Sequence, residues 1–197
     1  TINEAIKIND IIEARNHFNC VDFILSEATT PLSQKFILQL HSMIYSDCCG
    51  HRRKPLPSAG YRRAATTPKY GKTTPPKEIN IALGELFREY ESRDEIGFHE
   101  ILDIHVRFER IRPFEDANGR VGRLLMLKEC LRHNVTPFVI DDKRRTGYLD
   151  GIRQWDKERG ILIDVCMDAQ MRFEAQIALQ ELLEHQDCFK RITTEIQ

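Results

Sequence analysis

Apolar residues recur three or four residues apart along most of the chain, which is the spacing of one face of an α-helix. The most regular of these runs span Ile8 to Leu25, Leu32 to Met43 and Ile101 to Ile111. Thr-Thr-Pro at residues 29–31 separates the first two runs, and either Thr30 or Ser33 can cap the second helix. The pattern predicts a mainly helical protein.

The same spacing and local start signals predict further helices. They cover residues 76–91, 94–111, the residues that follow Asn118-Gly119, about 143–158 and about 161–187. Glycines, prolines and the basic run HRRK interrupt the pattern between Cys48 and Pro76. Within that segment, Tyr and Thr residues of 61–75 surround a Pro-Lys-Tyr-Gly, so a short exposed β-hairpin and a plain loop are equal alternatives.

Composition places the chain among soluble globular proteins. Its 197 residues suffice for one domain with one core, and 41% hydrophobic residues is too apolar for disorder. A formal net charge of -1 and a basic run without interleaved aromatic residues give no reason to expect a nucleic acid partner. No apolar run approaches the roughly 20 residues that cross a bilayer, and the first residues form no basic leader. We therefore expect a cytoplasmic protein without membrane contact.

Six cysteines are scattered through the sequence, at positions 20, 48, 49, 130, 166 and 188. No C-x-x-C pair and no Cys/His grouping has the spacing of a zinc site. Free thiols in a reducing cytoplasm fit this arrangement best. The adjacent Cys48-Cys49 is a redox or metal candidate, but small residues in a loop or at a helix end are the favoured interpretation.

Candidate chemistry lies in RPFEDANGRVGR, residues 112–123, between two predicted helices. A helix N-terminus presents unpaired backbone N–H groups, and Asn-Gly allows the backbone to approach an anion closely. Arg120 and Arg123 oppose the helix dipole there, which suggests that a ligand supplies negative charge. The preceding carboxylate, Asp116, suits a magnesium ion that bridges phosphates. These residues predict a nucleotide-phosphate loop.

A solvated surface loop is the competing interpretation of the same residues. In such a loop the arginines pair with the neighbouring carboxylates of Glu109, Glu115 and Asp116. Because most charged loops are solvated, the residues alone favour this interpretation slightly.

The loop sequence resembles the signature of the Fic family, H-P-F-x-x-G-N-G-R-x-x-R. It matches at Pro113, Phe114, Asn118, Gly119, Arg120 and Arg123. The stretches HVRFERI, VGRLLMLKECLRHNVTPFVIDD and LHSMIYSD are similar to Fic flanks, and GYRRAATTP is similar to the start of the family's target-binding flap. The resemblance implies an all-α, Fic-fold helical bundle with a short β-hairpin flap. It implies a single domain over 1–197, with a core at about 16–173, a flap at about 61–75 and a motif loop at 112–123.

Fic domains typically transfer AMP from ATP to a hydroxyl group of a target protein. The resemblance therefore implies ATP and Mg²⁺ as cofactors, and a protein substrate or the chain itself as the acceptor. Asp116 would hold the magnesium ion, and Phe114 would fix the loop to the core. The polyphosphate would be bound by an anion hole and two arginines, that is, by Asn118, Gly119, Arg120 and Arg123.

The flap would align the target hydroxyl by pairing backbone with backbone. On this resemblance its target-binding residues are Arg63, Ala64, Ala65 and Thr66. Homo-oligomerisation is left open by the sequence.

Two positions depart from the family pattern. The catalytic histidine, which takes the proton from the attacking hydroxyl, is Arg112 here, and a guanidinium has no lone pair that can accept a proton at neutral pH. Loss of a general base typically costs roughly 10²- to 10⁴-fold in rate. Ala117 replaces the usual glycine, as in the phosphorylating death-on-curing toxins. Those relatives have lysine two positions later, where this chain has Gly119, so their kinase activity is not carried over.

Other aromatic residues give weaker signals. His105 lies on an apolar helix face, and a buried structural role is favoured over a substitute base. Tyr148 and Trp155 fall near the region where such folds seat adenine, but core packing is at least as well supported.

Three functional hypotheses follow from the sequence. The leading one is an ATP- and magnesium-binding protein of the adenylyltransferase lineage, expected to be weak or inactive because of Arg112. The second is a non-catalytic module that binds a nucleotide, phosphate or acidic peptide. The third is an altered phosphotransferase.

Overall fold

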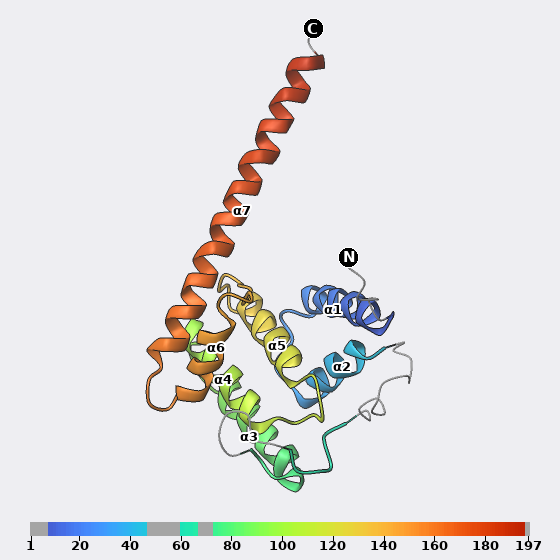
Figure 1. Ribbon diagram of the computed structural model, residues 1–197, viewed down its shortest axis with the longest axis vertical. Coiled ribbons are helices and arrows are strands. Elements are labelled where there is room, and N and C mark those ends of the chain that lie inside the picture. The colour runs from blue at the N-terminus through green and yellow to red at the C-terminus, as the bar shows by residue number, and fades with distance from the viewer. Residues whose placement is uncertain (1–7, 47–59, 67–72, 196–197) are drawn as a thin grey trace, which may run out of the picture. The chain divides into compact units, whose positions relative to one another are not determined.

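The computed structural model describes residues 8–46, 60–66 and 73–195, with side chains described only between 11 and 180. Every regular element among these residues is helical (Figure 1). In chain order the elements are α1 (Ile8–Ser26), α2 (Gln34–Ile44), the short 3-10 helix η1 (Pro76–Glu78), α3 (Ile79–Glu91), α4 (Phe98–Ile111), α5 (Asn118–Arg132), α6 (Arg145–Gln154) and α7 (Gly160–Glu195). The predicted all-α class is confirmed.

Local capping explains where two of these helices begin. The Ser33 hydroxyl accepts a hydrogen bond of 3.2 Å from the backbone N–H of Phe36, so Ser33 and not Thr30 is the cap of the two predicted candidates. The helix predicted from residue 94 begins only at Phe98, because the Glu100 carboxylate accepts the Gly97 N–H at 3.0 Å and fixes the start there.

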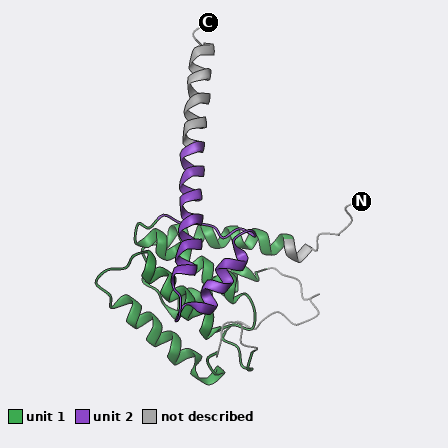
Figure 2. Cartoon of the chain, turned by 60° about the vertical axis from the view of Figure 1, so that its left-hand side comes forward, with its two compact units in different colours: residues 1–135 green, residues 136–197 purple. Residues whose placement is uncertain are grey.

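The chain divides into two compact units, residues 1–135 and 136–197 (Figure 2). The first contains α1 to α5 and the second contains α6 and α7. In the second unit α6 and α7 pack closely, since a Cβ on Gly151 would lie 2.7 Å from Leu162 Cα. Tyr148 and Trp155 are buried in this unit, at 3% and 2% exposure. The single-domain prediction is not tested by this division and stays a prediction.

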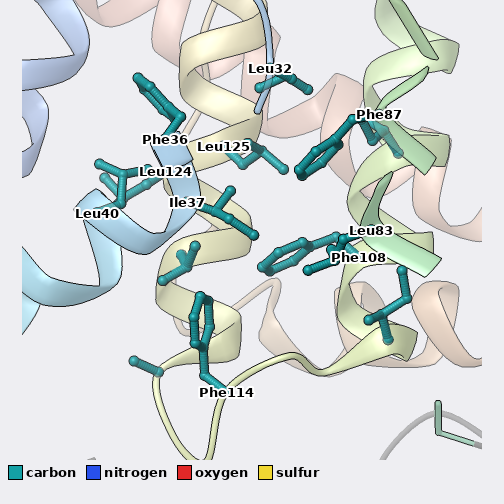
Figure 3. Packing of buried hydrophobic residues seen from close by; sticks show 14 of the residues in the cluster. Leu32, Phe36, Ile37, Leu40, Leu83, Phe87, Phe108, Phe114, Leu124 and Leu125 are labelled. Carbon is teal, nitrogen blue, oxygen red and sulfur yellow. The ribbon is translucent and has the colours of Figure 1, made fainter. Parts of the chain in front are cut away.

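A hydrophobic core joins all five helices of the first unit, and Figure 3 shows part of it. Apart from Leu32 and Phe114, the labelled side chains come from α2, α3, α4 and α5, and they include Phe36, Phe87, Phe108 and Leu125. Phe114, from the motif loop, points into the same core and is fully buried. The prediction that this side chain ties the loop to the core is confirmed.

Several sequence predictions fall on the flap and its surroundings. The described flap residues, 60–66 and 73–75, form turns and coil without a strand. Residues 67–72 lie outside the described residues, so the β-hairpin stays a prediction. The basic run at 51–54 and the adjacent cysteines 48 and 49 also lie outside them.

The cysteines whose side chains the structure describes form no disulfide, as expected. They are Cys20, Cys130 and Cys166, and all three are buried. Cys188 lies beyond the described side chains. Over the described ranges, no helix combines the length and apolarity that a membrane span requires.

Candidate functional site

Two non-glycine residues of the motif loop, at the ends of the segment between α4 and α5, lie in the left-handed region. Arg112 ends α4 with φ 48° and ψ 65°, and its N–H donates to the Phe108 carbonyl at 3.1 Å. Ala117 precedes α5 with φ 63° and ψ 10°. A left-handed backbone costs an L-residue roughly 1–2 kcal/mol, so other contacts must hold the loop in this shape.

Asn118 supplies one of these contacts. Its Oδ1 accepts the Phe114 N–H at 2.9 Å, and its Nδ2 donates to the Phe114 carbonyl at 2.8 Å. Since Asn118 is only 2% exposed, the amide closes the loop instead of facing a ligand. The Asn118 side chain therefore does not contribute to the predicted anion hole. The backbone N–H groups of the first turn of α5 are the part of it that can still donate to an anion.

A buried histidine forms the floor of the loop. The ring of His41, on α2, stacks on Phe114 with centroids 3.9 Å apart and planes inclined by 8°. Burial lowers the pKa of His41 to about 4, and the Asp116 backbone and carboxylate oppose this only in part. The imidazole is therefore neutral at pH 7 and behaves as a flat packing surface under the loop.

Arg62 fastens the flap to the motif loop, a role that sequence reasoning missed. It is only 3% exposed, and its backbone N–H donates to the Pro113 carbonyl at 2.8 Å. Its guanidinium donates to the main-chain carbonyls of Arg112 (2.7 Å), Ala64 (2.9 Å), Ile111 (3.4 Å) and Thr74. Burial and then the charge of Arg112 lower the pKa of Arg62, but an arginine stays charged at neutral pH.

A charged network joins α1, the end of α2 and the motif loop. The Tyr45 hydroxyl donates to Asp116 Oδ2 at 2.8 Å and accepts from Arg120 Nη2 at 3.0 Å. Arg120 Nη1 lies 2.5 Å from Glu13 Oε2, and Arg120 Nη2 lies 3.7 Å from Asp116 Oδ2. The solvated-loop interpretation paired the arginines with carboxylates that are close in sequence. The short ion pair of Arg120 is instead made with Glu13 on α1, which is 107 residues away in sequence.

Arg123 is exposed and lies over the first turn of α5. A Cβ on Gly119 would stand 3.3 Å from Arg123 Nη1, so the glycine leaves room for the guanidinium. Burial, then the charges of Arg123 and Arg120, lower the pKa of His17 on α1. Two cationic side chains on this side of the loop thus oppose protonation of His17.

Comparison with known proteins identifies the loop. Residues 31–130 match the model of the Fic/DOC family. The chain belongs to the Fic/DOC family. It is also similar to the protein adenylyltransferase Fic of Aedes aegypti, with 26% identity over 122 residues, which make up 60% of this chain and 23% of the mosquito protein.

Solved Fic structures share the fold. A Fic domain containing signaling protein from Bacteroides thetaiotaomicron has a TM-score of 0.64 at 24% identity, over 84% of this chain and 65% of its own. Fic-1 from C. elegans has a TM-score of 0.72 at 17% identity, over 92% of this chain and 55% of its own. The chain therefore spans less than two thirds of these proteins. The structural matches show the fold, and the relation to protein adenylyltransferases follows from the family match and the mosquito relative.

Arg112 is the residue that the sequence resemblance aligns with the Fic histidine. Its side chain is partly buried, and its Nε has no hydrogen-bond partner among the described residues. No ion pair in the described part of the chain joins it to Asp116, which instead accepts from Tyr45. The Arg112 guanidinium therefore has an unused hydrogen-bond donor at Nε.

His105 does not replace the missing base. It is fully buried, and its Nδ1 lies 3.0 Å from the Gly122 carbonyl oxygen. Burial lowers the pKa of His105 to about 4. The structural role predicted for this residue is confirmed.

The predicted flap residues lie beside the loop because Arg62 connects the two segments. Arg63, Ala64 and Ala65 are exposed, and Thr66 is partly buried. The Ala64 carbonyl already accepts one hydrogen bond from Arg62, so a target backbone could use only its second lone pair.

A magnesium ion fits the residues present at the loop. The described residues contain no group of three or more His, Cys, Asp or Glu that could form a complete metal cage. Mg²⁺ usually binds one or two carboxylates and takes its other ligands from water and phosphate. The Asp116 side chain, which is 61% exposed, offers one such carboxylate.

Proposed function

We propose that the chain is a cytoplasmic Fic-fold protein that binds ATP with Mg²⁺ at the motif loop, and that its AMP transfer to a protein hydroxyl is impaired. One observation carries this proposal: the loop is held in shape by the Asn118 amide and by Arg62, while the base position holds Arg112. These two features support a phosphate site that lacks its proton acceptor.

Binding requires three kinds of group from this chain. The N–H groups at the start of α5 would donate hydrogen bonds to phosphate oxygens, and Arg123 is exposed enough to contact the polyphosphate. Arg120 would have to exchange its contact with Glu13 for one with phosphate. Asp116 would hold magnesium, which when bound neutralises part of the polyphosphate charge.

Transfer further requires a proton acceptor beside the target hydroxyl. Arg112 cannot supply it, since a guanidinium keeps its protons at neutral pH. The buried imidazoles of His41 and His105 are neutral, but they are enclosed at 2% and 0% exposure. Acceptance of the hydroxyl proton is thus left to solvent, which supports slow or absent transfer.

A second candidate is a binding module for a nucleotide or phosphate without catalysis. The unused Nε of Arg112 favours it, because a guanidinium beside the loop can add a charge-assisted hydrogen bond to a phosphate oxygen.

The two candidates are separated by three proteins: the natural chain, Arg112→His and Arg112→Gln. Each is titrated with ATP and Mg²⁺ by calorimetry, then incubated with ATP, and its self-modification or modification of candidate target proteins is read by intact-mass spectrometry. Arg112→His should raise AMP transfer by at least about 10²-fold, the lower end of a general base's usual contribution. Arg112→Gln also removes the cation but adds no base, so it should stay inactive.

The outcomes are distinct. Transfer gained by Arg112→His alone supports the adenylyltransferase lineage. ATP binding by all three proteins without transfer replaces it with the binding module. Absence of ATP binding in the natural chain and in both variants overturns the proposal.

A further inference from the structure

We infer that Tyr45 is a positioning residue of the ATP and magnesium site, which keeps Asp116 and Arg120 apart as two separate ligands. The inference rests on the proposed function and assigns a role to a residue outside the motif loop.

The placement of the Tyr45 hydroxyl is fixed by its surroundings. Tyr45 follows the last residue of α2 and is only 8% exposed. The edge of its ring meets His41 at 5.4 Å between centroids, and the Arg120 guanidinium carbon lies 5.4 Å from its ring centroid. A buried ring that is packed in this way has little rotational freedom, so the position of its hydroxyl is fixed.

At that point the hydroxyl contacts both candidate ligands at once. It donates to Asp116 Oδ2 at 2.8 Å and accepts from Arg120 Nη2 at 3.0 Å. A phenolic hydroxyl has one proton to donate and lone pairs that accept, so it can make both contacts at the same time. One neutral group thus satisfies an anion and a cation together.

Without this group the two charges would satisfy each other. Asp116 and Arg120 are four residues apart, a spacing that favours ion pairs, and their nearest atoms are 3.7 Å apart. A direct two-pronged pair would occupy the carboxylate that magnesium needs and the guanidinium that phosphate needs. With the hydroxyl between them, the Asp116 side chain remains 61% exposed.

Tyr45→Phe tests the inference, because it removes the hydroxyl and keeps the ring. ATP is titrated into the natural chain and the variant by calorimetry, once with Mg²⁺ and once with a chelator. We expect ATP affinity in Mg²⁺ to fall about tenfold, the scale of one lost hydrogen bond to a charged group. The gain in affinity that Mg²⁺ gives should shrink, a change that a purely structural role would not cause.

A matched control and a double mutant sharpen the test. Tyr90→Phe removes the hydroxyl of another buried tyrosine, on α3, and should leave ATP affinity unchanged. In an Asp116→Asn background, Tyr45→Phe should change affinity less than about twofold, because residues that act through each other are not additive. Circular dichroism and thermal melting establish that each variant is folded.

The results separate the two proposals. If the natural chain does not bind ATP, the proposed function fails and the inference fails with it. If the natural chain binds ATP, and Tyr45→Phe matches Tyr90→Phe in affinity and in Mg²⁺ dependence, the inference alone is overturned.

Discussion

Replacing Arg62 with methionine removes the clamp between flap and motif loop and keeps most of the apolar stem. The guanidinium donates to four main-chain carbonyls, and the best measured bonds are those to Arg112 at 2.7 Å and Ala64 at 2.9 Å. A hydrogen bond to a charged group contributes about 1.5–3 kcal/mol. Part of this loss in stability, several kcal/mol, is offset because the variant no longer has to remove a cation from water when it folds. We expect Arg62→Met to lower the free energy of unfolding by about 3 kcal/mol.

Urea denaturation followed by circular dichroism measures this loss. Arg63→Met is the matched control, since the neighbouring arginine is exposed and a surface substitution usually changes stability by about 0.5 kcal/mol or less. Arg62→Lys keeps the charge but loses the planar fork, so it should recover only part of the loss.

The reasoning about Arg62 is refuted by either of two results. One is an Arg62→Met chain within about 1 kcal/mol of Arg63→Met, since that is less than one bond to a charged group contributes. The other is full recovery by Arg62→Lys, which would show that charge alone matters and not the set of acceptors.

Two further predictions concern pH and ligand competition. Burial lowers the pKa of His41 and His105 from 6.5 to about 4, so below pH 6.5 the unfolded chain binds more protons than the folded chain. The free energy of unfolding should therefore be highest above pH 6.5 and should fall as the pH drops towards 4. Urea titrations across this range check it, and a flat profile would contradict it; His105→Gln should reduce the slope. Glu13→Gln should raise ATP affinity severalfold by calorimetry, because Arg120 then loses its ionic partner at 2.5 Å, and unchanged affinity would mean that the pair does not compete with phosphate.

Helix content and the motif loop could be predicted from local patterns. Apolar spacing located the helices, the Ser33 cap was visible in the sequence, and the burial of Phe114 followed from the family resemblance. The helix predicted from residue 94 begins later, because Gly97 and Glu100 form a start that the apolar pattern does not register.

The contacts that shape the site could not be predicted in this way. Tyr45 and Asp116 are 71 residues apart, Arg62 and Arg112 are 50 apart, and Glu13 bonds to a partner 107 residues away. Such contacts depend on how helices pack, which spacing along one helix does not encode. An arginine in a polar segment is usually exposed, so nothing in the sequence marked Arg62 for burial.

The clamp on the loop reaches the main chain of residue 112 and not its side chain. The shape of the loop therefore does not depend on the side chain at this position. Substitutions there are limited mainly by the left-handed backbone at φ 48°. Asparagine, aspartate and histidine tolerate that conformation better than most residues, whereas β-branched ones do not. The side chain at position 112 can thus change, by loss of a base in evolution or by engineering of another reactive group, without a change in the structure of the loop.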